Sequence, residues 1–116
     1  MSARQRRKGI RFEQKLIRML LDIFPEAKSA RSESRNRDAK GIDICDTPGY
    51  AIQCKSTSRA PQYHRLIQEM RNGDDEIPVV VHEYTQKANA NFVVQGRYAI
   101  LPLEDFLGLL KDLQDR

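Results

Sequence analysis

The chain of 116 residues contains no tryptophan, only two cysteines and no long apolar run. Cys45 and Cys54 are too few for a disulfide scaffold, and neither belongs to a CxxC pair of the kind that binds zinc. We expect both to be thiols and, because His64 and His82 are isolated, we expect no zinc site. The longest apolar runs, VVV and LIRMLLDIF, are much shorter than a membrane-spanning segment, so no membrane partner is expected.

The first residues also lack the features of a secretory signal. The segment MSARQRRKG is basic, and no uninterrupted apolar region follows it. We therefore expect an intracellular protein of the cytoplasm or nucleoid. The length and the composition, 40% apolar and 31% charged, predict one folded domain over residues 1–116, with residues 1–8 as a basic, flexible arm.

Positive charge is concentrated in the first third of the chain. Residues 1–40 hold twelve Lys or Arg against five Asp or Glu, whereas residues 41–116 hold eight against eleven. A basic segment of this kind is typical of a protein that binds a phosphate backbone. The alternative is an ordinary solvated surface, and charge alone does not separate the two.

The first half of the chain predicts a helix, an edge strand, a loop and a hairpin. Apolar residues at helical spacing run from Ile10 to Phe24, and Pro25 ends the helix. The polar stretch EAKSARSESRNRDAKG favours an edge strand in its first half and a loop in its second. Residues 41–56, GIDICDTPGYAIQCKS, then alternate as two strands around a TPG turn.

The second half predicts a helix, two strands and a last helix. A short helix opens at Pro61 and closes at Asn72-Gly73, IPVVVHEY is a central strand, and NFVVQGRYAILP is a strand that bulges near Gly96. The last helix begins at Pro102. The order α-β-β-β-α-β-β-α indicates an α/β fold with a central mixed sheet flanked by helices. The apolar face of the Pro61 helix is Tyr63, Leu66, Ile67 and Met70, and the last helix is expected to bury Leu103, Phe106, Leu107, Leu110 and Leu113.

The hairpin has a predicted register. If Pro48 lies at the centre of a three-residue turn, residues whose numbers sum to 96 stand opposite each other. Ile42 then faces Cys54 and Ile44 faces Ile52, which gives one apolar face.

The other face of the hairpin is polar. Asp43 stands opposite Gln53, and Lys55 follows two residues along on the same face. A carboxylate beside an amide oxygen, flanked by an ammonium group, is a plausible site for a hard cation with an adjacent base or electrophile.

The first helix contains a second unusual residue. Counted at 100° per residue from Glu13, Leu20 and Phe24 fall at about −20° and +20°, so Glu13 lies within the apolar stripe. A buried carboxylate is costly unless it is paired or bound to a metal. The alternative is that Glu13 reaches solvent near the start of the helix.

The segments RKGIRFEQKLIRML, GID and IQCK together resemble the PD-(D/E)xK nuclease superfamily, and within it the archaeal and phage type of Holliday junction resolvase. The likeness covers the chain to about residue 60 in motif and the remainder in the order of elements. It implies a restriction-endonuclease-like fold and a metal-dependent endonuclease that resolves four-way DNA junctions by phosphodiester hydrolysis.

The resemblance implies a role for each site residue. Glu13 is the helical metal-site carboxylate, Asp43 the principal metal ligand and Lys55 the catalytic lysine. Gln53 and the backbone carbonyl of Cys54 complete the ligands of Mg²⁺, for which Mn²⁺ substitutes. The catalytic set is therefore Glu13, Asp43, Gln53 and Lys55.

Two residues depart from the motif. Gly41-Ile42 replaces the usual proline, and Gln53 replaces the usual acidic ligand. An amide oxygen binds Mg²⁺ without adding negative charge, so this site is expected to be weaker than an acidic one.

The basic residues and two serines of the first 40 positions are predicted to contact DNA, through backbone phosphates rather than bases. Because a junction must be cut symmetrically in two strands, the resemblance also implies a homodimer bound to branched DNA. The DNA-binding residues are Arg6, Arg7, Lys8, Arg11, Arg31, Ser32, Ser34, Arg35, Arg37 and Lys40.

Three alternatives remain from the sequence. The first is a related nuclease that acts on flaps, ends or single strands. The second is a DNA-binding module whose metal site has decayed through Gln53. The third, a purely structural domain, leaves Glu13 and the polar hairpin face unexplained.

Overall fold

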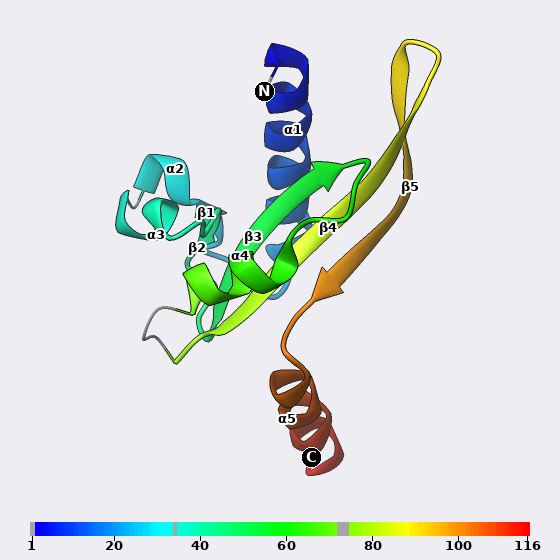
Figure 1. Ribbon diagram of the computed structural model, residues 1–116. Helices are drawn as coiled ribbons and strands as arrows, with labels where there is room; N and C mark the ends of the chain where they lie inside the picture. The colour runs from blue at the N-terminus through cyan, green and yellow to red at the C-terminus, as the bar shows by residue number, and fades with distance from the viewer. Residues whose placement is uncertain (1, 34, 72–74) are drawn as a thin grey trace.

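The computed structural model describes residues 2–33, 35–71 and 75–116, without the side chains of residues 32 and 33. Its centre is a five-stranded sheet in the order β1-β2-β3-β4-β5, in which β3 and β4 are parallel and the other neighbours are antiparallel (Figure 1). The predicted α/β class, with a mixed sheet flanked by helices, is confirmed. The strands are β1 (Lys28–Ser29), β2 (Ile44–Cys45), β3 (Tyr50–Thr57), β4 (Ile77–Ala88) and β5 (Asn91–Ile100).

Two helices cover opposite faces of the sheet. On one face α1 (Ala3–Leu20) packs Leu16 against Ile44 and Ile52. On the other face α4 (Tyr63–Met70) forms a second apolar cluster with Ala51 and Val80. Figure 1 shows β3 and β4 between these two helices.

The first helix begins seven residues earlier than predicted. Ser2 caps it in a capping box, in which the Gln5 N–H donates to the Ser2 hydroxyl and the Ser2 N–H donates to the Gln5 side chain. The prediction of a flexible arm over residues 1–8 is therefore wrong, because residues 3–8 form the first turns of α1. Arginine, lysine and glutamine are good helix formers, so the apolar period alone underestimated the helix.

Two short helices replace the predicted loop before the hairpin. The edge strand is confirmed as β1, but α2 (Ala30–Glu33) and α3 (Arg35–Ala39) follow it. Helices of four and five residues leave no periodic apolar stripe, so the pattern did not reveal them. The predicted order α-β-β-β-α-β-β-α is corrected to α-β-α-α-β-β-α-β-β-α.

The hairpin register is confirmed where Ile44 pairs with Ile52. The turn is closed by the Tyr50 N–H, which donates to the Thr47 carbonyl at 3.0 Å, and Gly49 supplies the positive φ of 90° that its third position needs.

The predicted faces of the hairpin are wrong. Ile42 packs with the α4 cluster whereas Ile44 packs with the α1 cluster. The reason is that β2 begins only at Ile44, and the Asp43 N–H donates to the Ile52 carbonyl instead of pairing with Gln53. Because β3 has neighbours on both sides and helices on both faces, its alternation does not separate a core face from a solvent face.

The long hairpin of β4 and β5 follows the prediction. β4 is an interior strand between β3 and β5, and it runs on to Ala88. The register shifts between Tyr84, paired with Gly96, and Thr85, paired with Val94, which confirms a bulge next to Gly96. β5 is the edge strand at the end of the sheet opposite β1.

The Pro61 helix is confirmed as α4, with Leu66, Ile67 and Met70 buried. Tyr63 is 52% exposed, so it lies outside the buried face. The predicted stop at Asn72-Gly73 falls outside the described residues.

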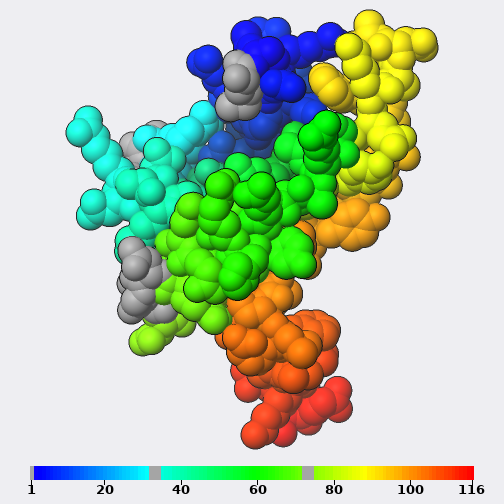
Figure 2. Space-filling view, viewed as in Figure 1, coloured from blue at the N-terminus to red at the C-terminus, as the bar shows by residue number. Residues whose placement is uncertain are grey.

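The last helix, α5 (Leu103–Gln114), lies where the sequence predicted it, but its apolar face is not buried. Each of the five predicted core residues is at least 41% exposed. Asp105 and Leu109 are the half-buried members and mark the side that faces the body, and Figure 2 shows α5 projecting from that body. Within residues 2–33, 35–71 and 75–116, no helix is long and apolar enough to cross a membrane.

Candidate active site

A cleft of about 570 Å³ lies where α1, the segment before β2 and the end of β3 meet. Its lining includes all four residues predicted to be catalytic, together with Cys54. They come from α1, from the segment before β2 and from β3, so only the tertiary fold brings all four to one place. They are Glu13, Asp43, Gln53 and Lys55.

Glu13 is buried and fully partnered. Its side chain accepts a hydrogen bond from the Ser29 hydroxyl at 2.9 Å through Oε1, and its Oε2 lies 2.9 Å from Nη2 of Arg31. These two contacts offset the cost of burying an ionised carboxylate that is only 6% exposed. The predicted burial of Glu13 is confirmed, and the alternative that it reaches solvent is wrong.

Asp43 lies just before β2, and its Oδ2 accepts a hydrogen bond from the Cys54 N–H at 2.8 Å. Burial raises the pKa of Asp43 to about 6, and the negative charge of Glu13 adds to this rise. The Cys54 hydrogen bond and the Lys55 ammonium oppose it without cancelling it. The removal of the ionised Asp43 carboxylate from water is therefore the main cause of its raised pKa.

Gln53 has an oxygen with nothing to bind. The residue is only 7% exposed, and its Oε1 has no hydrogen-bond partner within the described part of the chain. Its side chain lies against Gly41, where an added Cβ would be 3.4 Å from the amide nitrogen. A buried acceptor without a donor costs on the order of 1–3 kcal/mol, so such groups usually mark an unseen ligand or a functional role.

Lys55 and Cys54 complete the β3 side of the cleft. Lys55 is half-buried, two residues after Gln53 on the same strand, so both side chains point to the same face of the sheet. Burial raises the pKa of the Cys54 thiol, and the charges of Asp43 and Glu13 raise it further. The neutral thiol is a poor metal ligand, which leaves the Cys54 backbone as the part of this residue that suits a hard cation.

The donor set fits a hard divalent cation. Asp43 supplies an under-compensated carboxylate and Gln53 an unpartnered oxygen, and oxygen is what Mg²⁺ and Mn²⁺ prefer. Among the described residues there is no group of three or more His, Cys, Asp or Glu side chains placed to hold a metal.

Three of the predicted DNA-binding residues line this cleft: Arg6, Lys8 and Arg31. Arg7 and Arg11 lie on the other side of α1, where they line a second cleft with Lys8. The Lys8 ammonium donates to the Thr85 hydroxyl at 3.0 Å, and burial lowers the pKa of Lys8 against the opposing effect of Glu83.

The other residues predicted to contact DNA do not line this cleft in the described part of the chain. Arg37 forms a two-pronged ion pair with Glu76, with distances of 3.0 and 3.2 Å, and lines a separate depression near the hairpin turn. Arg35 is exposed on α3 and Lys40 is half-buried after it. Ser34 and the side chain of Ser32 lie outside the described residues.

Sequence reasoning missed two polar groups near the site. Ser29 orients Glu13, although nothing in its spacing distinguished it from the other serines of its segment. Glu83, only 6% exposed on β4, accepts from the Ser56 hydroxyl at 2.8 Å and pairs with Arg97 at 3.0 Å. An acidic residue inside a β-branched strand was the available signal for Glu83.

No protein-family model, no curated protein and no solved structure matches this chain.

Proposed function

We propose that this protein is a metal-dependent DNA endonuclease of the PD-(D/E)xK type, with four-way junctions as its substrate. The observation that carries the proposal is the unpartnered Oε1 of Gln53, in one cleft with Asp43 and Lys55. A hard cation at this point would give the Gln53 oxygen a partner and would offset the cost of ionising the buried Asp43 carboxylate.

Asp43 and Gln53 would hold the ion, with the Cys54 carbonyl as a further oxygen. When bound, Mg²⁺ supplies Lewis-acid polarisation of the phosphate and a more acidic water. Glu13 would join the ligands once Arg31 turns to a DNA phosphate, since one guanidinium group would then exchange one anionic partner for another.

Cationic side chains of the protein would orient the water, stabilise the developing charge and hold the DNA strand. Lys55 would orient the attacking water and stabilise the charge that grows on the phosphoryl oxygens. The water adds to phosphorus and one P–O ester bond breaks, which leaves a phosphate monoester and a free hydroxyl as the two ends. Arg6 and Lys8, which line the same cleft, would hold the scissile strand through its phosphates.

The decisive test compares Asp43→Asn with a matched control in the same hairpin. Asp46→Asn makes the same chemical change at an exposed carboxylate, which pairs with Lys28 outside the cleft. Labelled four-way junction, duplex and single-stranded DNA are each incubated with Mg²⁺, Mn²⁺ or EDTA. We expect wild type and Asp46→Asn to cut junctions only with metal, and Asp43→Asn to lose at least about 100-fold in rate while it still binds DNA.

Full activity of Asp43→Asn would rule out the metal-site assignment. Preference for single strands or flaps would instead identify a related nuclease. Binding without cleavage by the wild type would favour the second candidate, a DNA-binding module. The observation that favours that candidate is the ion pair of Glu13 with Arg31, which engages one of the two carboxylates of the cleft.

Symmetrical cutting requires two active sites, so we propose a homodimer formed through α5. Five exposed residues form one apolar stripe along α5: Leu103, Phe106, Leu107, Leu110 and Leu113. A two-fold dimer would pack this stripe of one copy against the same stripe of the other.

A further inference from the structure

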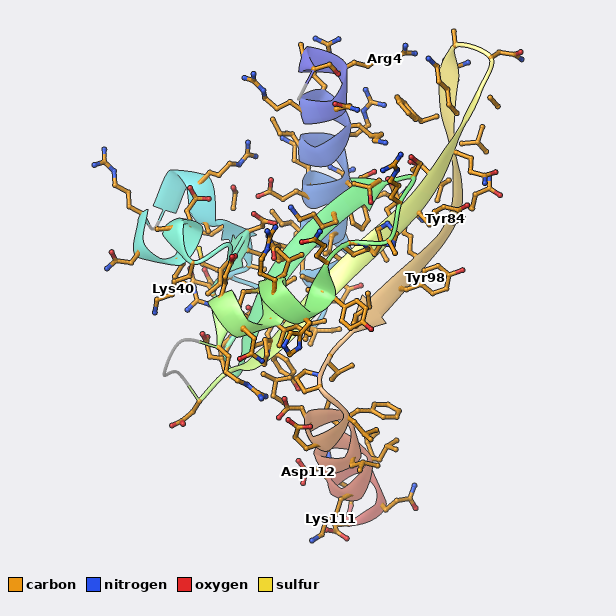
Figure 3. The ribbon with its side chains drawn as sticks, viewed as in Figure 1. Arg4, Lys40, Tyr84, Tyr98, Lys111 and Asp112 are labelled. Carbon is orange, nitrogen blue, oxygen red and sulfur yellow. The ribbon has the colours of Figure 1, made fainter. Side chains whose placement is uncertain are left out.

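A basic stripe runs along the side of α1 that faces away from Glu13. Its residues recur at helical spacing, and counted at 100° per residue they centre about 180° from Glu13. They line a second cleft of about 540 Å³ between α1 and the β4–β5 hairpin. Figure 2 shows the N-terminal half of α1 beside this hairpin, and Figure 3 shows Arg4 close to its tip. The stripe consists of Arg4, Arg7, Lys8, Arg11 and Lys15.

Phe92 lines the second cleft and contacts two cations of the stripe. The Lys8 ammonium lies 3.9 Å from the centre of its ring and the Arg4 guanidinium 5.5 Å. Lys8 and Phe92 line both clefts, so they form the boundary between them.

The positive charge of the second cleft is not balanced from within. Its one carboxylate, Glu83, already accepts from Ser56 and pairs with Arg97. Arg7 and Arg11 are exposed and form no ion pair with any carboxylate in the described ranges.

The stripe also opposes the stability of its own helix. The first turn of α1, which is described throughout, has no acidic residue, while Arg4, Arg6 and Arg7 lie near its positive end. Cations there interact unfavourably with the helix dipole, and like charges one turn apart repel each other. An arrangement that lowers stability in this way is expected where an anion binds.

We propose that the second cleft binds the phosphate backbone of the DNA strand that is not cut, on the opposite side of α1 from the candidate active site. The inference rests on the proposed function and adds the path of the second strand. The stripe runs from Arg4 to Lys15, about 16 Å along the helix, which is longer than any single phosphate and suits a polyanion. An α-helix is about 10–12 Å across, close to the roughly 12 Å width of the major groove, so two backbones can flank α1.

The test measures binding in EDTA, so that cleavage plays no part. The double variant Arg7→Gln, Arg11→Gln is compared with Arg18→Gln, Arg65→Gln, which removes the same charge from exposed positions outside both clefts. Fluorescence anisotropy gives the affinity for duplex, four-way junction and single-stranded DNA over a range of salt concentrations. Unlabelled pyrophosphate is added as a competitor.

We expect the Arg7/Arg11 variant to bind duplex and junction more weakly, with a plot of log affinity against log salt shallower by up to about 2 units. The control should change the slope by less than half as much. Single-stranded DNA, which has no second backbone, should be affected much less than duplex. Pyrophosphate at equal ionic strength should not displace the DNA.

An equal loss of affinity for single-stranded and duplex DNA in the Arg7/Arg11 variant would overturn the inference. Equal salt slopes for this variant and its control would also overturn it. Displacement by pyrophosphate would show a site for small phosphates and would also overturn it. Failure of the proposed function gives a different result. If the wild-type protein cuts no DNA but shows the predicted salt slopes, the nuclease proposal is wrong and the inference about the second cleft still holds.

Discussion

At the scale of single residues, Asp43 and Gln53 are both costly to hold in the cleft without a bound cation. Asp43 carries a charge that burial and Glu13 disfavour, and Gln53 carries an oxygen to which no described group donates. Both features lower the stability of the metal-free protein. Destabilising groups that converge on one cleft are the usual cost of a functional site.

Asp43 makes stability depend on pH in the metal-free protein. Its pKa is about 6 when folded, against an ordinary value of 3.8, so between these values the folded state binds more protons than the unfolded state. Stability therefore falls as the pH rises through this window, and above pH 6 the full cost, at most about 3 kcal/mol, is present. Asp43→Asn removes this cost, so in EDTA it should unfold several degrees above wild type at pH 7.5 and close to wild type at pH 4.

Thermal unfolding at the two pH values, with and without Mg²⁺, measures this effect. Asp46→Asn should show no comparable change between pH 4 and 7.5, because its carboxylate is exposed. Mg²⁺ should reduce the difference in unfolding temperature between Asp43→Asn and wild type at pH 7.5, since it stabilises only the wild-type site. If this difference in unfolding temperature were the same at both pH values, ionisation of Asp43 would cost no more in the folded protein than in the unfolded chain.

Gln53→Glu is expected to strengthen metal binding and weaken the metal-free protein. A second carboxylate beside Asp43 increases the charge available to the cation but also increases repulsion when no cation is present. The Mg²⁺ concentration for half-maximal cleavage should fall about tenfold, and the unfolding temperature in EDTA should drop.

Gln68→Glu adds the same charge on the exposed side of α4 and serves as the control. Titrations of cleavage rate against Mg²⁺ for the three proteins make the comparison. An unchanged metal dependence in Gln53→Glu would show that this side chain does not contact the ion.

At the scale of elements, α1 carries different chemistry on its two sides. One side places Glu13 beside Ser29 and Arg31, and the other presents the basic stripe to the β4–β5 hairpin. The same helix therefore contributes to the core, to the candidate active site and to the second cleft. Because the first turn of α1 holds basic rather than acidic residues, the capping box of Ser2 and Gln5 stabilises the start of the helix in place of favourable charge.

The exposed face of α5 yields a prediction about assembly. Arg71 pairs with Glu104 and Asp105, which ties the start of the helix to the body while the apolar stripe points away. Leu107→Gln, Leu110→Gln should therefore convert a dimer to a monomer without unfolding it, because both side chains are exposed in the single chain. A helix of 12 residues is only about 18 Å long, so the dimer should depend on concentration.

Size-exclusion chromatography with light scattering, at several protein concentrations, is the measurement. Met19→Gln, Ile23→Gln removes two apolar side chains elsewhere that are at least as exposed, and it should leave the dimer intact. A wild type that stays monomeric at the highest concentration would contradict the α5 interface, as would a dimer that survives in Leu107→Gln, Leu110→Gln.

At the scale of the whole molecule, the two clefts lie on opposite sides of one helix and share Lys8 and Phe92 as their boundary. The acidic α5 helix projects at the far end, as the placement of Lys111 and Asp112 in Figure 3 shows. The net charge of +4 is therefore a poor description of the surface, which is basic where DNA is proposed to bind and more acidic where a second copy is proposed to bind.

The sequence by itself determined the features that depend on local spacing and local geometry. The mixed α/β class, the Ile44–Ile52 register, the bulge near Gly96 and the burial of Glu13 all follow from helical or strand periods, turn residues and the cost of a charge in an apolar stripe. The sequence also identified the four residues of the candidate active site, because each is polar within an apolar pattern.

Only the tertiary structure decided how these residues are satisfied. That Glu13 is held by Ser29 and Arg31, that Asp43 contacts the Cys54 backbone rather than Gln53, and that Arg37 pairs with Glu76 depend on segments far apart in the chain. The exposed face of α5 was equally hidden, because an apolar stripe has the same spacing whether it meets the core or solvent. Periodicity reports which side of an element is apolar, whereas long-range packing selects what covers that side.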